Sequence, residues 1–472
     1  MEEQPLAPAA LEPGSFRDPD SRVLVVDGRV LRALSPQGLE DWRALQASPL
    51  FTALTAEEKL VGTRELEEQL PEDALHGDVA GALEHDVVPF VSYPYEWPFE
   101  MLRDAALLQL ELVRRAIDAG LMLKDATPYN IQFRGARPIF VDVGSFEQLR
   151  EGEPWVAYRQ FCMLFLYPLL LHAWKGIPQQ PWLRGSLDGI TPQECRDLLS
   201  TRDLFRRGAL THVALHARLE RRHADRGGEV RTELKQAGFK KELIVANVRG
   251  LERLISRLRP PVAGSTWSSY ELTSTYTEAD AERKRDFVAA AVAAVQPRLV
   301  WDVGCNEGHH ARLAATTADT VVAMDADAVV VGRLYEELAR EEVTNVLPLV
   351  VDVTDPSPGL GWRLSERRPL VDRGRPDLTL ALALVHHVSI PGNVPIAELV
   401  RWLHGLGGET VVEFPTPEDP MVQRLLSRKR PGDHPDYNRE WFERCLRERF
   451  DVVASDELAG GQRVLYRARA RS

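Results

Sequence analysis

A chain of 472 residues is too long for one ordinary hydrophobic core, so we expect at least two domains. Its 44% hydrophobic and 27% charged residues are typical of a soluble globular protein. The formal net charge of −12 argues against a broad basic surface, so nucleic acid is not expected as a partner. The four cysteines have no C-x-x-C spacing, which fits a reducing cytosol better than a disulfide scaffold or a zinc site, and no metal centre is expected.

Residues 1–20 are predicted to be a flexible tail. Met1–Pro13 carries three glutamates and several prolines, not the basic end and apolar run of a signal peptide. The longest apolar stretch, Phe161–Ala173, is too short to span a bilayer and predicts a buried helix. We therefore expect a cytoplasmic protein with no membrane partner.

Residues 21–258 are predicted to form the N-terminal domain, which is largely helical. Ser21–Leu34 predicts two short strands around the turn signal Asp27-Gly28. Val87–Phe99 combines β-branched and aromatic residues with three prolines, which predicts an edge strand passing into a loop. Glu100–Ala119 then has apolar residues at helical spacing.

A hairpin region of this domain carries polar residues at a characteristic spacing. Asp125 is followed five positions later by Asn130, and Asp142-Val143-Gly144 comes after a hairpin. This spacing resembles that of protein kinases, in which H-R-D-x-x-x-x-N and D-F-G orient a hydroxyl and hold magnesium. The resemblance implies an α+β kinase-like domain with a candidate nucleotide and magnesium site at Asp125, Asn130 and Asp142.

The same domain departs from the kinase pattern in two places. It has no G-x-G-x-x-G loop near the N-terminus, and the strand Val30–Leu34 offers only Arg32 where kinases carry a lysine. ATP would be bound poorly without either part. The alternative is that Asp125 and Asn130 are turn residues of a non-catalytic kinase-like domain.

Residues 259–264, with Pro260, Pro261 and Gly264, are predicted to be a linker. Residues 265–472 then form the second predicted domain. Three aromatic residues near its start are candidates either to contact a cofactor or acceptor, or to pack a helix onto a sheet: Trp267, Tyr270 and Tyr276.

The stretch Leu299–Asp327 predicts a strand, a glycine turn, a helix and a second strand. Its turn has the spacing D-x-G-x-x-x-G, formed by Asp302, Gly304 and Gly308, with Cys305 and Asn306 between the glycines. Glycine allows a sharp turn there, and backbone N–H groups at the start of the helix would face a bound molecule. The second strand ends in Asp325, at the position where nucleotide-binding α/β units place an acid on ribose hydroxyls.

Two further strands are predicted, Pro348–Asp352 and Asp377–Val385, the second leading into His386 and His387. This order resembles the class I S-adenosylmethionine-dependent methyltransferases, whose motif I is D-x-G-x-x-x-G. The resemblance implies a Rossmann-like sheet and S-adenosyl-L-methionine as cofactor. The implied cofactor-binding residues are Asp302, Gly304, Cys305, Asn306 and Gly308, with Asp325 on the ribose and Asp352 on the adenine. A nicotinamide site is the rival interpretation, but G-x-G-x-x-G is not present here.

The two histidines are the candidate catalytic residues. In class I methyltransferases the end of the fourth strand lies beside the acceptor, and a histidine there can take a proton as the acceptor is methylated. The alternative is that His386 and His387 are structural. Glu413 follows the apolar run Thr410–Val412, a predicted fifth strand, and is expected at the same edge of the sheet.

The combination of SYPYEW, LKDATPYNIQF, FVDVGSFE, DVGCNEG, GWRLSERRP, LALALVHH and an EFP segment resembles a bacterial family of methyltransferases related to a rhizobial host-specific nodulation protein. The expected fold is α/β, with a C-terminal class I methyltransferase sheet behind an α+β kinase-like domain. The implied activity is methyl transfer to an unidentified acceptor, a small molecule or a protein, which the N-terminal domain positions unless it only braces the catalytic domain. The alternatives are a phosphotransferase, a bifunctional kinase–methyltransferase, and a non-catalytic binding module.

Overall fold

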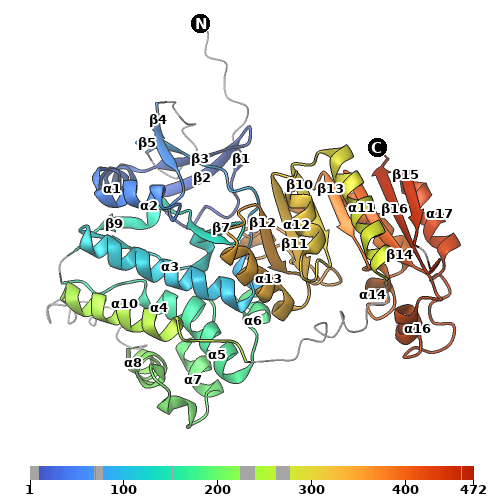
Figure 1. The fold of residues 1–472 in the computed structure, drawn as a ribbon. Helices are drawn as coiled ribbons and strands as arrows, with labels where there is room; N and C mark the ends of the chain where they lie inside the picture. Colours follow the sequence, from blue (N-terminus) through green and yellow to red (C-terminus); the bar gives the residue numbers. More distant parts are fainter. Residues whose placement is uncertain are drawn as a thin grey trace, which may run out of the picture. The chain divides into compact units, whose positions relative to one another are not determined.

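The computed structural model describes residues 10–67, 70, 78–150, 152–223, 240–261, 277–458 and 460–471. These residues form two compact units (Figure 1). The first comprises the described residues within Met1–Phe133, Pro138–Val262 and Gly359–Arg368. The second comprises those within Arg134–Arg137, Ala263–Pro358 and Pro369–Ser472. Each unit therefore takes a short segment from the sequence range of the other. Trp267, Tyr270 and Tyr276 lie outside the described residues.

The first unit contains a five-stranded antiparallel sheet with the strand order β1-β2-β3-β5-β4. Its strands are β1 (Ala10–Leu11), β2 (Ser21–Val26), β3 (Arg29–Leu34), β4 (Thr63–Leu66) and β5 (Gly81–His85). The predicted hairpin is confirmed, because β2 pairs with β3 across Asp27 and Gly28. Both turn residues have positive φ angles, 51° and 78°, as a two-residue type I′ turn requires.

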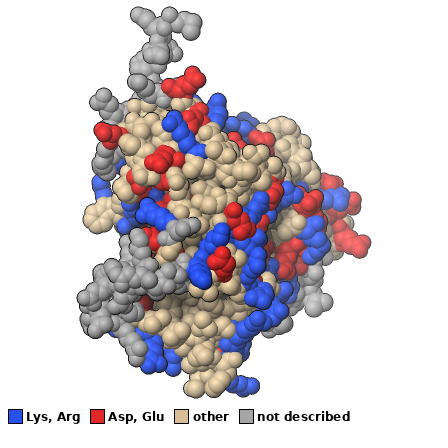
Figure 2. Space-filling view, turned by 90° about the vertical axis from the view of Figure 1, so that its left-hand side faces the viewer, with Lys and Arg blue, Asp and Glu red and all other residues tan. Residues whose placement is uncertain are grey.

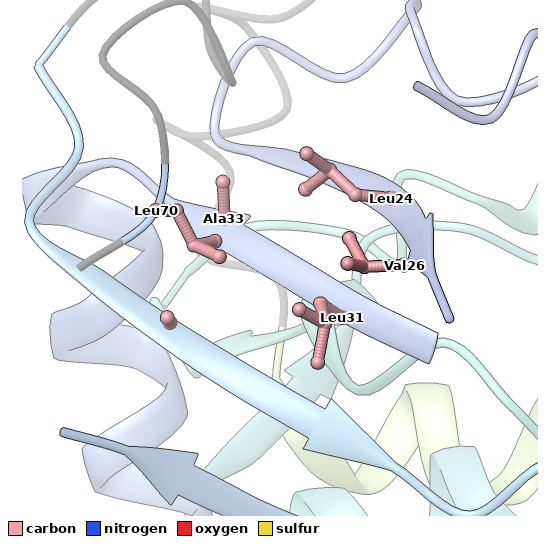
Figure 3. Close-up of a cluster of buried hydrophobic side chains, with 6 residues drawn as sticks. Leu24, Val26, Leu31, Ala33 and Leu70 are labelled. Carbon is pink, nitrogen blue, oxygen red and sulfur yellow. The ribbon is translucent and has the colours of Figure 1, made fainter. Parts of the chain in front are cut away.

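One face of this sheet carries a hydrophobic cluster, drawn in Figure 3. It consists of Leu24, Val26, Leu31, Ala33, Leu70 and Ala82. Successive side chains of a strand point to opposite faces, so Arg32 lies on the face opposite Leu31 and Ala33. The sequence of β3 thus places one basic residue on the other side of the sheet, away from the cluster.

The rest of the first unit is mostly helical, as predicted. Its α-helices are α1 (Pro36–Ala47), α2 (Pro49–Ala56), α3 (Phe99–Asp118), α4 (Tyr158–Phe161), α5 (Tyr167–Lys175), α6 (Gln179–Gly185), α7 (Pro192–Leu198), α8 (His216–His223) and α10 (Lys241–Ile255). The predicted buried helix over Phe161–Ala173 is confirmed as the end of α4, a π-helical segment and α5. Two small two-stranded sheets, β6 (Leu121–Leu123) with β9 (Phe146–Gln148) and β7 (Ile131–Arg134) with β8 (Arg137–Phe140), frame the predicted kinase-like motif.

The edge strand predicted over Val87–Phe99 is wrong. This segment contains only a short 3₁₀ helix, Pro94–Glu96, before α3 begins. Prolines lack the N–H that a strand ladder needs, and the segment has three of them. The Glu96 carboxylate instead accepts the backbone N–H of Tyr93 at 3.0 Å and closes a local turn.

The second unit is built on a seven-stranded sheet with the order β12-β11-β10-β13-β14-β16-β15. Its strands are β10 (Leu299–Val303), β11 (Thr320–Asp325), β12 (Val346–Val350), β13 (Leu378–Ala381), β14 (Glu409–Pro415), β15 (Phe450–Glu457) and β16 (Arg463–Ala470). The first five strands in this order are parallel, and β16 and β15 pair antiparallel at one edge. After β10 the chain adds strands on one side, and from β13 onward it adds them on the other side. Open α/β sheets bind their ligands at such a change of strand order.

Helices cover both faces of this sheet. All seven positions of β14 are therefore buried. They are α11 (Glu278–Val295), α12 (His309–Ala315), α13 (Ala328–Arg340), α14 (Val385–Ser389), α15 (Ile396–Leu406), α16 (Pro420–Leu426) and α17 (Arg439–Arg449). The predicted placement of His386 and His387 at the end of a strand is wrong. β13 ends at Ala381, and both histidines lie in α14, because Ala383 turns the chain with a left-handed φ of 49°.

The described helices include none that is long and apolar enough to cross a membrane. Acidic and basic side chains are interspersed on the face drawn in Figure 2.

Candidate functional site

The glycine turn after β10 is tied to the neighbouring strand. The N–H groups of Gly304 and Cys305 donate to the carbonyl of Met324 at 2.8 and 2.9 Å. The Asn306 N–H donates to Oδ2 of Asp325 at 3.0 Å. The turn and the acid predicted for the ribose are therefore held together at the carboxyl edge of the sheet.

Both glycines of the turn are required by backbone conformation and by space. Gly304 has a φ of 79° and Gly308 a φ of 78°, which L side chains rarely adopt. A Cβ on Gly308 would come within 2.7 Å of Leu334, a side chain that is only 1% exposed. A Cβ on Gly304 would lie 3.3 Å from Leu384, so the turn after β13 approaches the glycine turn closely. Cys305, between the glycines, is a packed thiol whose burial raises its pKa well above the usual value.

Asp325 and Asp352 lie at the ends of adjacent parallel strands. Asp325 ends β11, and its Oδ1 also accepts the N–H of Asp327 at 2.9 Å. Burial raises the pKa of Asp325. Asp352 follows β12, is exposed, and accepts the N–H of Thr354 at 2.8 Å. Their positions at the ends of neighbouring strands suit a ligand that extends across the edge of the sheet.

Asp302 is a buried acid with one carboxylate oxygen that is not hydrogen-bonded in the described part of the chain. Its side chain is 2% exposed, and its Oδ2 has no hydrogen-bond partner among the described residues. Burial raises the pKa of Asp302 to about 7. An orphaned carboxylate oxygen directly before the glycine turn favours a donor or cationic group supplied by a ligand.

The two histidines of α14 differ in their surroundings. Their ring centroids are 4.0 Å apart. His386 is fully buried, and neither of its ring nitrogens has a hydrogen-bond partner in the described part of the chain. His387 is partly exposed. Burial lowers the pKa of His387 to about 4 and that of His386 well below 6.5, so both imidazoles are neutral at pH 7.

A buried network of charges lies beside these histidines. Glu413 on β14 pairs with Lys284 of α11 at 2.7 Å and with Arg463 of β16 at 3.2 Å. Arg463 also pairs with Asp419, the N-cap of α16, at 2.7 Å. The four residues are at most 7% exposed. Two cations and two carboxylates balance each other, which buried charges require.

Sequence reasoning placed Glu413 at this edge but missed Lys284 and Arg463. A signal for Lys284 was present. The buried positions of α11 include Asp280, Lys284, Val288 and Val292, spaced by four residues, so the lysine stands in the core-facing stripe of the helix. Arg463 offered no comparable signal.

The predicted kinase-like residues of the first unit are also brought together. Asn130 donates its Nδ2–H to Oδ2 of Asp142 at 3.1 Å. Burial, and next the charge of Asp142, raise the pKa of Asp125. Arg32 pairs with Oδ1 of Asp142 at 2.8 Å and donates to His85 and Ser21. A guanidinium therefore neutralises the carboxylate that kinases use to hold magnesium.

No protein-family model matches the chain. A curated relative, the nodulation protein NoeA of Rhizobium meliloti (strain 1021), is 34% identical over 475 residues, covering 99% of this chain and 98% of the relative. The solved structure of N-methyltransferase NodS from Bradyrhizobium japonicum WM9 with S-adenosyl-L-homocysteine is 13% identical and covers 44% of this chain and 100% of NodS, with a TM-score of 0.31. Magnesium protoporphyrin IX methyltransferase (ChlM) from Synechocystis PCC 6803 with bound SAH is 16% identical, covering 47% of this chain and 94% of ChlM with a TM-score of 0.30. At such TM-scores the likeness to either structure carries no argument for function.

Proposed function

The chain belongs to the family of the nodulation protein NoeA, and we propose that it transfers a methyl group from S-adenosylmethionine to an acceptor still to be identified. The observation that carries the proposal is the Gly304–Gly308 turn, joined through the Asn306 N–H to the carboxylate of Asp325. The strand order, with parallel strands and one antiparallel hairpin at the edge, is that of class I methyltransferases and supports the same assignment.

The residues of the turn fit this cofactor. Gly304 and Gly308 hold the left-handed conformations that the turn needs, and Asp325 can accept hydrogen bonds from ribose hydroxyls. Asp352 lies at the end of the next strand, on the side proposed for the adenine. The orphaned Oδ2 of Asp302 offers a partner to a cationic group. When bound, the cofactor would supply an electrophilic methyl group on a positively charged sulfur.

The proposed role of His387 is to accept the proton that the acceptor releases. Its imidazole is neutral at pH 7, the form that can accept a proton, and it is more exposed than His386. His386, fully enclosed, supports the first turn of α14 in this proposal. Together these assignments predict an acceptor that loses a proton as it is methylated, such as a hydroxyl or an amine.

Binding of the demethylated product tests the cofactor site. Asp325→Ala is expected to weaken binding of S-adenosylhomocysteine by about 1.5–3 kcal/mol, because charge-assisted hydrogen bonds are lost. Isothermal titration calorimetry measures this directly. Asp319→Ala is the matched control, since Asp319 is exposed and lies before the opposite end of the same strand. Absence of binding by the wild type, or tighter binding of NAD, would contradict the proposal.

For the first unit, we propose a kinase-like cleft that holds the acceptor or braces the catalytic unit and does not transfer phosphate. Arg32 stands on the third strand of the sheet, where kinases place the lysine that grips phosphates. Its guanidinium forms an ion pair with Asp142. This pairing favours a cleft without phosphotransferase activity over the bifunctional alternative.

An assay with magnesium and labelled ATP tests this proposal. We expect no hydrolysis or self-phosphorylation above that of the Asp142→Ala variant, because the sequence has no glycine loop and Arg32 is paired with Asp142, so the phosphates would be poorly neutralised. Arg32→Ala serves as the matched variant, since it frees Asp142 and Asn130 to hold the metal. Activity in the wild type that disappears in Asp142→Ala would establish a bifunctional protein.

A further inference from the structure

We propose that Glu413 is a positioning residue for the methyl transfer, because it fixes the turn that leads from β13 into the histidine helix α14. The inference rests on the proposed function, since the histidines matter only if the acceptor is methylated beside them. Glu413 lies on β14, the strand that pairs with β13 in parallel. It reaches the turn through the backbone of Ala383.

Both oxygens of Glu413 pair with a cation, and one of them also accepts a backbone N–H. Oε2 accepts the N–H of Ala383 at 2.9 Å and also pairs with Lys284 at 2.7 Å. Oε1 pairs with Arg463 at 3.2 Å. The side chain is fully buried. A carboxylate held from two sides in this way has one orientation, and so does the N–H that it accepts.

The turn needs such a partner because its backbone is strained. Ala383 has a φ of 49°, a left-handed conformation that is unfavourable for a residue with a Cβ. Strain of this kind persists only where the surroundings fix the conformation. The following residue, Leu384, approaches Gly304, and His386 and His387 come next in the chain. The turn therefore connects the glycine turn to the histidines.

A purely structural ion pair is the alternative explanation of Glu413. The same strand offers a comparison in Glu409, an acidic residue at its other end that is 7% exposed. Glu409 pairs with Arg467 at 2.6 Å and with Arg469 at 2.8 Å, on the neighbouring strand. Glu409 stabilises the sheet far from the turn, so Glu409→Gln is a control for the loss of a buried carboxylate on β14.

Two double variants separate the hydrogen bond from the charge. Lys284→Met with Glu413→Gln removes the ion pair but keeps an oxygen for the Ala383 N–H. Lys284→Met with Glu413→Leu removes the ion pair and the acceptor. Arg463 keeps Asp419 as a partner in both, so the remaining charges stay paired. The Gln side chain can also accept a hydrogen bond from Arg463, which the Leu side chain cannot, so amide exchange at Ala383 is the measurement specific to the turn.

The expected results are read by NMR of ¹⁵N-histidine-labelled protein, by amide exchange at Ala383, and by calorimetry with S-adenosylhomocysteine. The Gln variant and Glu409→Gln should keep the His387 ring shifts and the protection of the Ala383 amide. The Leu variant should change the ring shifts, lose the protection and bind S-adenosylhomocysteine about 3- to 10-fold more weakly. Equal behaviour of the Gln and Leu variants in all three measurements would overturn the proposal.

Glu413→Asp tests the same inference with the charge balance kept, in case the Leu variant does not fold. The shorter side chain withdraws the carboxylate from the fixed N–H of Ala383, whereas the long side chains of Lys284 and Arg463 can follow it and stay paired. It should reproduce the ring shifts and the loss of protection expected for the Leu variant, and unchanged spectra would overturn the proposal. A wild type that fails to bind S-adenosylhomocysteine would refute the proposed function instead, since amide exchange and ring shifts report on the turn without the cofactor.

Discussion

Replacing His387 by Asn is expected to lower methyl transfer by about 10²–10⁴-fold while cofactor affinity stays nearly unchanged. Asn keeps a polar side chain of similar reach but cannot accept a proton. His387 is the candidate because it is partly exposed, whereas His386 is enclosed. Mass spectrometry of cells that express the active gene first identifies the molecule that gains one methyl group. The rate is then measured as incorporation of a labelled methyl group into that acceptor.

Two variants control for general damage near the site. His309→Asn changes an exposed histidine at the start of α12 and should leave the rate unchanged. His386→Asn should act mainly on stability, because it alters a fully buried side chain. A rate loss below about threefold in both His386→Asn and His387→Asn would make the pair structural.

The dependence of the rate on pH gives an independent check of the same role. Burial lowers the pKa of His387 to about 4, so its imidazole is already neutral and able to accept a proton at pH 5. We expect no fall in kcat between pH 8 and 5 from this residue. A wild-type rate that declines with an apparent pKa near 6.5, and no longer does so in His387→Asn, would show that the imidazole is not depressed as the structure indicates.

The sequence was sufficient where the constraint is local. D-x-G-x-x-x-G fixes a turn within seven residues, and the structure gives both glycines positive φ angles. Asp325 could be assigned for the same reason, because a βαβ unit sets the distance between a turn and the end of the next strand. The hairpin around Asp27 was equally local.

The sequence was insufficient where distant residues decide the backbone. The run Asp377–Val385 looks like one long strand, yet β13 stops at Ala381. Its end depends on the left-handed turn at Ala383, whose N–H is held by Glu413, 30 residues later. Propensity and periodicity describe neighbours along the chain and carry no information on such a contact.

The polar residues around Asp142 in the first unit show the same limit for side chains. Arg32 was recognised as the residue in place of a lysine, but its partner could not be read from spacing. The ion pair with Asp142 joins positions 110 residues apart and decides that the carboxylate is already neutralised. The spacing of Asp125, Asn130 and Asp142 predicted that they lie close together. The ion pair of Arg32 with Asp142 is what makes a magnesium site less favourable there, and the spacing could not predict it.

The second unit is expected to lose stability on mild acidification, because its buried histidines are neutral in the folded state. Burial lowers the pKa of His310 to about 3, that of His387 to about 4, and that of His386 well below 6.5. In the unfolded chain each would titrate near 6.5. Below pH 6.5 the unfolded state therefore binds protons that the folded state does not.

This difference in bound protons makes the free energy of unfolding fall as the pH falls. A pKa lowered in the folded state contributes stability above the unfolded value, and that stability is lost as the pH falls from 6.5 toward 4. Asp302 acts in the opposite direction, because burial raises its pKa to about 7 and the folded state keeps its proton. Burial also raises the pKa of Asp325. Three histidines against two aspartates leave roughly one to two protons, or about 1.4–2.7 kcal/mol for each pH unit between 6 and 5.

Urea unfolding of the full chain at pH 7, 6 and 5 measures this loss. His85 and His212 of the first unit, whose pKa values burial lowers to about 3 and about 4, have the same sign and add to the fall. His310→Gln should flatten the dependence by about one proton, whereas His309→Gln should not, since His309 is exposed. A free energy of unfolding that stays constant from pH 7 to 5 would mean that these imidazoles take up protons in the folded state. In that case His387 would also be charged at pH 5, and the proton-accepting role proposed for it would fail below neutral pH.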